Sequence, residues 1–260
     1  MEILLNYWSL IILFFGIAVL YASVGFGGGS SYLAFLILFG FEFDSIRSTA
    51  LICNIVVVSS GVFIYYKKGL LNVKATLPLI LLSVPFAFIG GSIQLQEANF
   101  FLLLGIVLFV AGIVLLLRSI GFISNSNGIL DKNKSNLFNA GLGGSIGFLS
   151  GLVGIGGGIF LSPVLHLMNW DKARKIAATA SFFILINSIA GLLGQLKSRT
   201  FQINSSLVFA LVLAVFVGGQ IGSRIGTTNF NANTIRFITA ILVLFVATRI
   251  IVKYLPLLNY

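Results

Sequence analysis

Charged residues are scarce in this chain of 260 residues, at 8% of the total, against 58% hydrophobic residues and a mean hydropathy of +1.09. This composition excludes a water-soluble globular domain and predicts an all-α integral membrane protein. Helices rather than β-barrel strands are expected because the apolar segments show no alternation of polar and apolar residues. Eight windows contain no Asp, Glu, Lys or Arg: 3–41, 48–66, 75–96, 98–117, 135–170, 176–196, 200–223 and 237–248. Most reach the length of about 20 residues that a helix needs to cross a bilayer.

Acidic residues, cysteine and histidine are also few, which excludes several chemistries. All six acidic residues lie at window edges, so no carboxylate is expected inside the membrane to carry a coupling proton. One cysteine, Cys53, and one histidine, His166, cannot together supply a metal site, and Cys53 has no partner for an internal disulfide. The chain also lacks a GxxxxGK[ST] phosphate-binding loop. We therefore expect no enzyme activity, no cofactor and no bound metal.

The 16 lysines and arginines give a net charge of +10 and cluster at the ends of the apolar windows. In a membrane chain this placement indicates topology rather than a nucleic-acid site. We expect a small anion and the lipid bilayer as partners and no nucleic acid. A homodimer is left open.

Glycine, in contrast, is abundant, and it recurs in two similar motifs, VGFGGGSS at 24–31 and VGIGGGIF at 153–160. Each motif lies inside a window too long for one crossing, because a helix through 3–41 or 135–170 would reach about 55 Å against a hydrocarbon core of about 30 Å. Each window is therefore expected to break at its glycines, and close helix packing is the alternative reading. The arms 30–41 and 159–170 would then be half-helices, whose amino termini form an anion cradle in a polar cavity.

The two motifs belong to a longer internal match. Asp44 and Arg47 correspond to Asp171 and Arg174, Thr49-Ala50 to Thr179-Ala180, Gly61 to Gly191 and Gly90-Gly91 to Gly218-Gly219, at offsets between 127 and 130. This order at nearly constant spacing predicts a duplication. We assign membrane repeat 1 to 1–118, a hydrophilic cytoplasmic linker to 119–136 and membrane repeat 2 to 137–260.

Polar residues near the glycine motifs complete the predicted site. In apolar surroundings they are expected to face the protein interior, although Ser, Thr and Asn also serve as interhelical hydrogen-bond partners. The predicted substrate-binding set is Gly25, Gly27, Gly28, Gly29, Ser30, Ser31, Thr49, Asn54, Gly154, Gly156, Gly157, Gly158, Thr179, Ser181 and Asn187.

Three further residues are candidates for anion steering or a proton relay. Arg47 and Arg174 each follow an aspartate, Asp44 or Asp171, by three residues, and these aspartates are expected to cap new helices. The arginines would then lie at cavity mouths and steer the anion. His166 is the only histidine, and a buried, hydrogen-bonded imidazole is the alternative to a proton relay.

GFGGGSSYLAFLILFG in the first half, GLVGIGGGIFLSPVLHLMNWDKARKIAATASFF in the second, and the late GG pairs resemble the sulfite exporter TauE/SafE family of bacterial membrane permeases. The resemblance covers nearly the whole chain. It implies a transporter of small sulfur-containing anions, such as sulfite or organosulfonates like sulfoacetate, in the bacterial inner membrane. A channel, or a permease for another small organic anion, is the alternative.

Two topologies remain open for the duplicated halves, which together would hold 8 to 10 helical segments. If each long window turns back, the repeats are inverted, and 11 basic residues lie on the linker's side against 5 on the other. If each window is one broken crossing, the repeats are parallel and the counts are 10 and 6. The positive-inside rule favours inversion. The linker is cytoplasmic in both cases.

Overall fold

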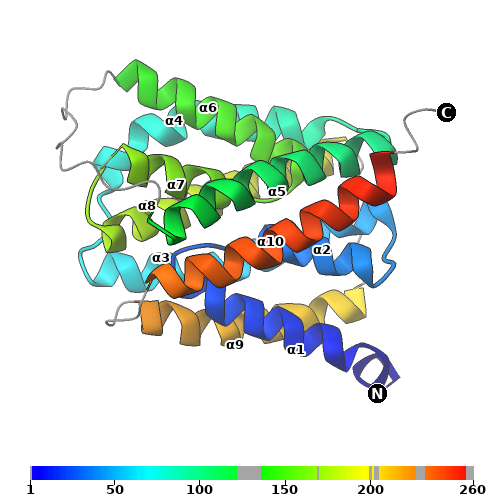
Figure 1. Cartoon of the computed structure of the whole chain (residues 1–260). Helices are drawn as coiled ribbons and strands as arrows, with labels where there is room; N and C mark the ends of the chain where they lie inside the picture. The colour runs from blue at the N-terminus through cyan, green and yellow to red at the C-terminus, as the bar shows by residue number, and fades with distance from the viewer. Residues whose placement is uncertain are drawn as a thin grey trace. The chain divides into compact units, whose positions relative to one another are not determined.

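The computed structural model describes residues 2–121, 136–168, 170–198, 201, 205–226 and 232–255. Over these residues the chain is all-α, as the composition predicts. Its ten helices are α1 (Glu2–Ser23), α2 (Gly29–Leu38), α3 (Phe43–Lys67), α4 (Val73–Ser92), α5 (Glu97–Ser119), α6 (Asn136–Val153), α7 (Gly158–Leu167), α8 (Ala173–Lys197), α9 (Ser205–Gly226) and α10 (Ala232–Tyr254) (Figure 1). Most of the predicted linker 119–136 lies outside the described residues.

Five of the described helices, α3, α4, α5, α8 and α9, are long and apolar enough to cross a membrane. α1, α2 and α6 contain shorter apolar stretches. The expectation of a multi-pass membrane protein is therefore supported by helix length as well as by composition.

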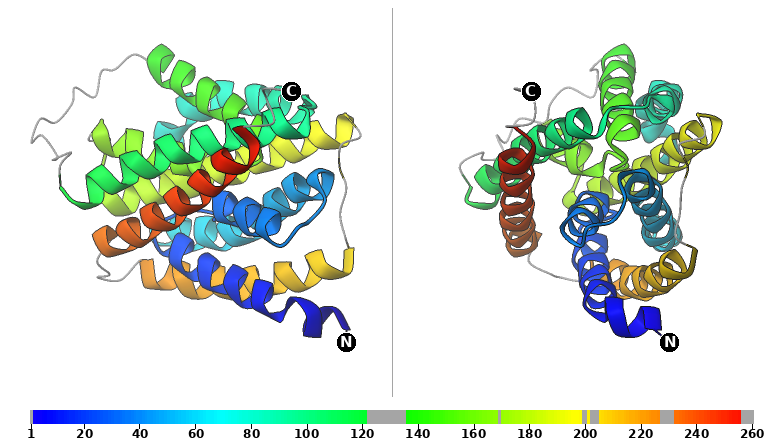
Figure 2. Two further views of the ribbon diagram at one scale, coloured as in Figure 1. Left: turned by 45° about the vertical axis from the view of Figure 1, so that its right-hand side comes forward. Right: turned by 90° about the vertical axis from the view of Figure 1, so that its right-hand side faces the viewer.

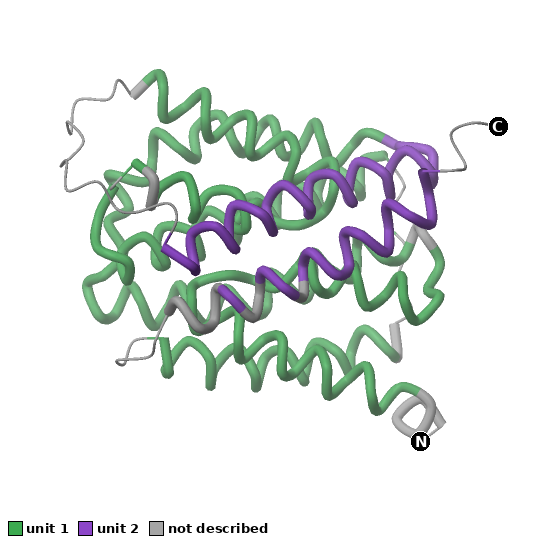
Figure 3. The backbone as a smooth tube through the Cα atoms, in the orientation of Figure 1, with its two compact units in different colours: residues 1–93, 128–230 green, residues 94–127, 231–260 purple. Residues whose placement is uncertain are grey.

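The chain divides into two compact units, one made of 1–93 and 128–230 and the other of 94–127 and 231–260 (Figure 3). The second unit consists of α5 and α10. These helices are antiparallel, because Gly105 of α5 lies against Ile251 of α10, whereas Gly112, further along α5, lies against the earlier residue Leu244. The rings of Phe101 and Tyr254 pack at the same interface with centroids 4.4 Å apart.

In the first unit, small residues let helices from distant parts of the sequence pack closely. α4 and α6 run parallel, since Gly143, Gly147 and Gly151 face the backbone of residues 79, 83 and 87 in turn. α1 and α9 are paired in the same way and lie side by side in Figure 2, where Gly218, Gly222 and Gly226 face residues 15, 19 and 23. A Cβ at most of these glycines would collide with the neighbouring backbone, so the spacing of four residues builds both interfaces.

The centre of the first unit is the antiparallel pair of α3 and α8. The hydroxyl of Ser48 donates to Oε1 of Gln195 at 2.9 Å near one end of the pair. Tyr65 packs against Ala177 and Ala178 near the other end. Helix α3 is thus in contact with α8 along most of its length, and α9 lies beside it.

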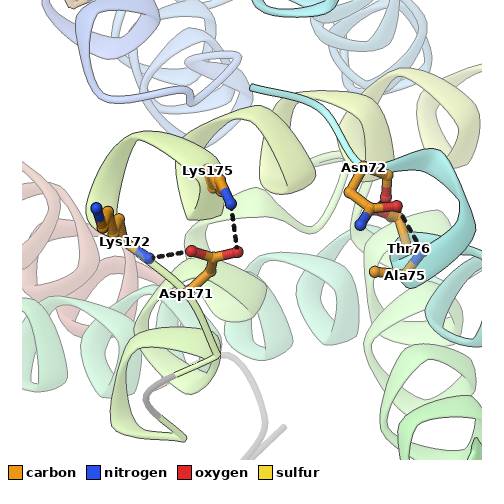
Figure 4. Close-up of polar contacts among 6 residues, drawn as sticks. All are labelled: Asn72, Ala75, Thr76, Asp171, Lys172 and Lys175. Atoms are coloured by element: carbon orange, nitrogen blue, oxygen red, sulfur yellow. Dashed lines mark hydrogen bonds and ion pairs between the residues drawn. The ribbon is translucent and has the colours of Figure 1, made fainter. Parts of the chain in front are cut away.

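Polar side chains mark the starts of two of these helices (Figure 4). Asn72 caps α4 by accepting a hydrogen bond from the backbone N–H of Ala75 at 3.1 Å. At α8 the N-cap residue is Lys172, and Asp171 accepts from its backbone N–H at 2.7 Å while its other oxygen pairs with Lys175 at 3.3 Å. Asp171 therefore orders the start of α8 from one residue before the N-cap. The side chain of Asp44 lies outside the described residues.

Candidate functional site

Two glycine segments separate helices in the first unit. Helix α1 ends at Ser23 and α2 begins at Gly29, while α6 ends at Val153 and α7 begins at Gly158. Gly28 has φ 87° and Gly157 has φ 83°, a backbone conformation that residues with a Cβ rarely adopt. Helices α2 and α7 have 10 residues each, so each is about 15 Å long, half the thickness of a hydrocarbon core.

A small cavity of about 10 Å³ lies where the two glycine segments meet, a volume that holds about one water molecule. Among the described residues, no charged side chain lines it. Its lining residues are Tyr21, Phe26, Gly27, Gly28, Gly29, Ser30, Ile155, Gly158, Ile159 and Ile184.

The first residues of two helices take part in this lining. Helix α2 begins at Gly29 and α7 at Gly158, and both glycines line the cavity. The N-cap of α2 is Gly28, which has no side chain that could accept a hydrogen bond from the first N–H groups of the helix. Because a helix amino terminus carries about half a positive charge, two such ends at one cavity favour a negative guest without a charged side chain.

Asn54 of α3 joins the two glycine segments. Its side chain is fully buried, and its Nδ2 donates to the carbonyl of Ile155 at 2.9 Å. The same side chain lies against the first segment, where a Cβ on Gly27 or Gly29 would collide with its amide. Its Oδ1 has no hydrogen-bond partner. A buried acceptor left unpaired costs about 1–3 kcal/mol.

Hydroxyl groups gather on the side of the cavity formed by the first half of the chain. The Tyr21 and Ser31 hydroxyls are 2.6 Å apart and both buried, and Ser30 lines the cavity. From the second half, the Ser181 hydroxyl donates to the carbonyl of Gly25 at 3.0 Å. These hydrogen bonds fix the position of the α1–α2 segment.

The other predicted binding residues do not line the cavity. Thr49 and Thr179 are buried. Asn187 donates to the carbonyl of Phe183 in its own helix at 2.8 Å. A Cβ on Gly25 would meet Ala177, one on Gly154 would approach Arg47, and one on Gly156 would meet Ser188. Their role in substrate binding stays a prediction.

The two candidate steering arginines have different environments. Arg47 is 5% exposed, and its guanidinium donates to the carbonyls of Gly151 at 3.2 Å and Ile93 at 3.4 Å. It therefore lies against the carboxyl end of α6, where helix carbonyls favour a cation. Arg174 is exposed. The side chain of His166 lies outside the described residues.

Five of the lining residues were not in the predicted set. Phe26, Ile155 and Ile159 lie within the two glycine motifs, whereas Tyr21 and Ile184 lie outside them. Tyr21 precedes Gly25, the first glycine of the first motif, by four residues, which is about one helical turn, and that spacing could have suggested it. Ile184 carries no chemical signal of its own. Its position at the cavity results from the packing of α8 against the second glycine segment, which the sequence alone does not reveal.

Comparison with known proteins gives a consistent result over most of the chain. The family model described as "Sulfite exporter TauE/SafE" matches residues 10–250. The chain is 35% identical to "Probable membrane transporter protein y4hK" of Sinorhizobium fredii, over 91% of this chain and 94% of that protein. It is 29% identical to "Probable membrane transporter protein MJ0441" of Methanocaldococcus jannaschii, over 82% and 83% respectively. No solved structure matches.

Proposed function

Because the chain belongs to the sulfite exporter TauE/SafE family of membrane transporters, we propose that it is a secondary transporter of small sulfur-containing anions such as sulfite or organosulfonates, for example sulfoacetate. The anion binds between the two glycine segments, in an alternating-access mechanism. The observation that carries this proposal is the small cavity lined by the first residues of α2 and α7 and by no charged side chain among the described residues. The protein acts in the inner membrane of a bacterial cell and catalyses no reaction.

Equal helix lengths support two homologous repeats on either side of the 119–136 linker. α2 and α7 have 10 residues each, α3 and α8 have 25 each, and α5 and α10 have 23 each. The bounds of α3 and α8 are related by a shift of 130 residues, and those of α2 and α7 by 129.

Contacts also recur under this shift. Gly25 lies against Ala177, and Gly154 lies against Arg47. The shift relates Gly25 to Gly154 and Arg47 to Ala177, so each of these contacts is the counterpart of the other. In the same way Leu51 approaches Gly191, and Ser181 approaches Gly61. Reciprocal contacts of this kind are what a pseudo-twofold axis between two repeats produces.

The directions of corresponding helices favour inverted repeats. α3 is antiparallel to α8, and within the second unit α5 is antiparallel to α10. If these pairs are equivalent, the axis that relates them lies in the membrane plane, as in many transporters. α1 with α2, and α6 with α7, then form re-entrant hairpins that meet at the cavity.

Charge supports a cytoplasmic linker. The start of α6 follows the linker and marks one end of the first unit, called here the linker end. The end of α3, the start of α8 and the end of α9 lie at the same end. Two described basic residues, Arg47 and Lys197, lie toward the opposite end. Seven lie toward the linker end: Lys67, Lys68, Lys74, Lys172, Arg174, Lys175 and Arg224. An excess of Lys and Arg marks the cytoplasmic side.

In this mechanism the backbone N–H groups at the start of α2 and α7 hold the anion, with hydroxyls from Ser30 and Ser31. A cavity of about 10 Å³ is smaller than sulfite, so the site has to widen for the anion to bind. The site opens to either side as one repeat moves against the other.

Counterflow in proteoliposomes tests the proposal. Vesicles loaded with unlabelled sulfite or sulfoacetate should accumulate the labelled anion transiently, with saturable initial rates. Vesicles that carry the Gly28→Val variant serve as the control and should show no accumulation. Flux that rises linearly with concentration, without counterflow, would identify a channel instead. No flux of any anion would overturn the proposed function.

A further inference from the structure

An apolar groove lies between α4 and α8 in the first unit and shares no lining residue with the cavity at the glycine segments. It has a volume of about 510 Å³ and is lined by four residues of α4, between Val84 and Ile89, and by four of α8, between Ile186 and Leu193. All eight are apolar. Small-molecule sites have volumes of about 300–1,000 Å³, so the groove has the size of a ligand site.

The groove opens to the outside of the helix pair. The side chains of Ile89, Ile189 and Leu193 are 49%, 40% and 51% exposed. Both helices are long and apolar enough to cross a membrane, so these side chains face hydrocarbon. The helices themselves are tightly packed, because a Cβ on Gly91 would collide with the carbonyl of Gly191. The groove is therefore a hollow on the surface of a closely packed pair, and a hydrocarbon chain suits its lining.

Lys197 lies at one end of this groove. The four lining residues of α8 follow one another at steps of three and four residues, so they share one face of the helix. Lys197 is four residues beyond Leu193, about one turn further along the same face. Its Nζ lies 5.5 Å from the ring centroid of Phe88, which lines the groove from α4. Lys197 is exposed, so its ammonium group is accessible to a ligand in the groove.

The charge of this surface favours an anionic occupant. Neither α4 nor α8 contains an aspartate or a glutamate, so a second copy of these helices offers Lys197 no carboxylate. In a twofold dimer the same surface meets itself, and two Lys197 side chains with like charge would approach each other. An anionic lipid instead supplies a negative head for the lysine and a hydrocarbon chain for the groove.

We propose that the groove between α4 and α8 is a binding site for an anionic phospholipid. One acyl chain lies along the groove on Ile89, Ile189 and Leu193, and the phosphate accepts a hydrogen bond from Nζ of Lys197. A lipid bound in this way stabilises the α4–α8 pair, because it binds the folded protein only. It is a bound partner at a site of its own, whichever anion the glycine segments accept.

Lipid titration of the purified full-length protein, freed of co-purified lipid, tests the proposal. In an uncharged detergent, phosphatidylglycerol and phosphatidylcholine with identical acyl chains are compared by the rise in unfolding temperature with lipid concentration. Phosphatidylglycerol should bind about fivefold more tightly, equivalent to about 1 kcal/mol for one lysine. Glycerol phosphate, the head without chains, should give no rise at the same concentrations, because burial of hydrocarbon supplies most of the affinity.

Single substitutions at the end of the groove test the role of the charge. Lys197→Gln should abolish the preference for phosphatidylglycerol, and Lys197→Arg should keep it. Lys67→Gln is the matched control, because Lys67 ends α3 as Lys197 ends α8, and its Nζ lies 4.4 Å from the ring centroid of Phe63, which does not line the groove. This variant should retain the full preference.

A substitution within the groove tests the place of the acyl chain. Ile189→Trp fills the groove from an exposed position and should weaken both lipids at least about tenfold, because the loss of two buried methylene contacts suffices for that. Equal binding of both lipids to the wild type, or an unchanged preference in Lys197→Gln, would overturn the proposal. The proposal is also wrong if no lipid raises the unfolding temperature. A dimer that Ile189→Trp dissociates would then assign the groove to a contact between copies.

Discussion

At the scale of single residues, Gly28 and Gly157 are positions where both the backbone conformation and the neighbouring side chains disfavour any residue with a Cβ. Both have positive φ, at 87° and 83°, and a Cβ on Gly28 would lie 2.8 Å from the Tyr32 ring, while one on Gly157 would lie 3.0 Å from the Phe183 ring. Replacement of either by valine should abolish anion binding while membrane insertion persists. The left-handed backbone alone costs about 1–2 kcal/mol with a side chain, and crowding adds about 1–3 kcal/mol.

Gly40 provides the control for these substitutions. It also has positive φ, at 75°, but nothing lies within 4 Å of a Cβ placed there. Gly40→Val should therefore keep anion binding, measured as ligand-induced thermal stabilisation of the purified protein. If Gly28→Val and Gly157→Val bind anions as the wild type does, the glycine segments do not form the site.

The hydroxyl of Tyr21 is a second residue-scale test. Tyr21→Phe removes the partner of the Ser31 hydroxyl and should destabilise the protein by about 1 kcal/mol and weaken anion binding up to about tenfold. Tyr32→Phe is the matched control. The Tyr32 hydroxyl is buried with no hydrogen-bond partner, so its removal should be neutral or stabilising. Thermal unfolding and anion titration of both variants check this. Equal losses in both would mean that the Tyr21 hydroxyl has no special role.

Sequence reasoning could reach the glycines of the site but not the whole lining. Glycine is conspicuous because a long apolar window must change direction somewhere, and a residue without a Cβ permits that change. Tyr21 and Ile184 are ordinary residues of apolar helices. Whether they line the cavity depends on which helices pack against each other, and a single sequence does not encode that in a local pattern.

At the scale of helices, close packing depends on which face carries glycine. On α6, Gly147 lies against the backbone of Ser83, with only 2.6 Å between its Cβ position and that Cα, whereas nothing lies within 4 Å of a Cβ on Gly141. Gly147→Ala should therefore destabilise the protein by about 1–3 kcal/mol, as overpacking does. Gly141→Ala should stabilise it by up to about 1 kcal/mol, since alanine has the higher helix propensity. Thermal unfolding of the two variants tests this, and equal effects would contradict the α4–α6 interface.

The order of the helices was predictable, but the length of α10, which has 23 residues against 12 in its charge-free window, and the pairing of the helices were not. Charge-free windows placed the helices because each needs about 20 apolar residues to span the membrane. The pairing exchanges partners between the halves, with α4 beside α6 and α9 beside α1. Glycines spaced by four residues indicate that a close interface exists. They do not name the partner, because most helices of this chain carry small residues.

At the scale of the whole molecule, inverted and parallel repeats place two equivalent loops differently. Glu42 precedes α3 and Lys172 precedes α8, so each lies in the loop that connects a short helix to a long one. Inverted repeats put Glu42 and Lys172 on opposite sides of the membrane, and parallel repeats put them on the same side. Both side chains are exposed, whereas the native Cys53 is fully buried and should react little.

Cysteine labelling in intact cells can therefore decide the topology. With a membrane-impermeant maleimide, Glu42→Cys should be labelled from outside, and Lys172→Cys should be labelled only after the cells are opened. The wild-type chain gives the background from Cys53, and retained anion counterflow shows that each variant is folded. Labelling of both variants from the same side would contradict the inverted arrangement. The proposed re-entrant hairpins would then not enter from opposite sides of the membrane, and the first residues of α2 and α7 could not bind one anion together.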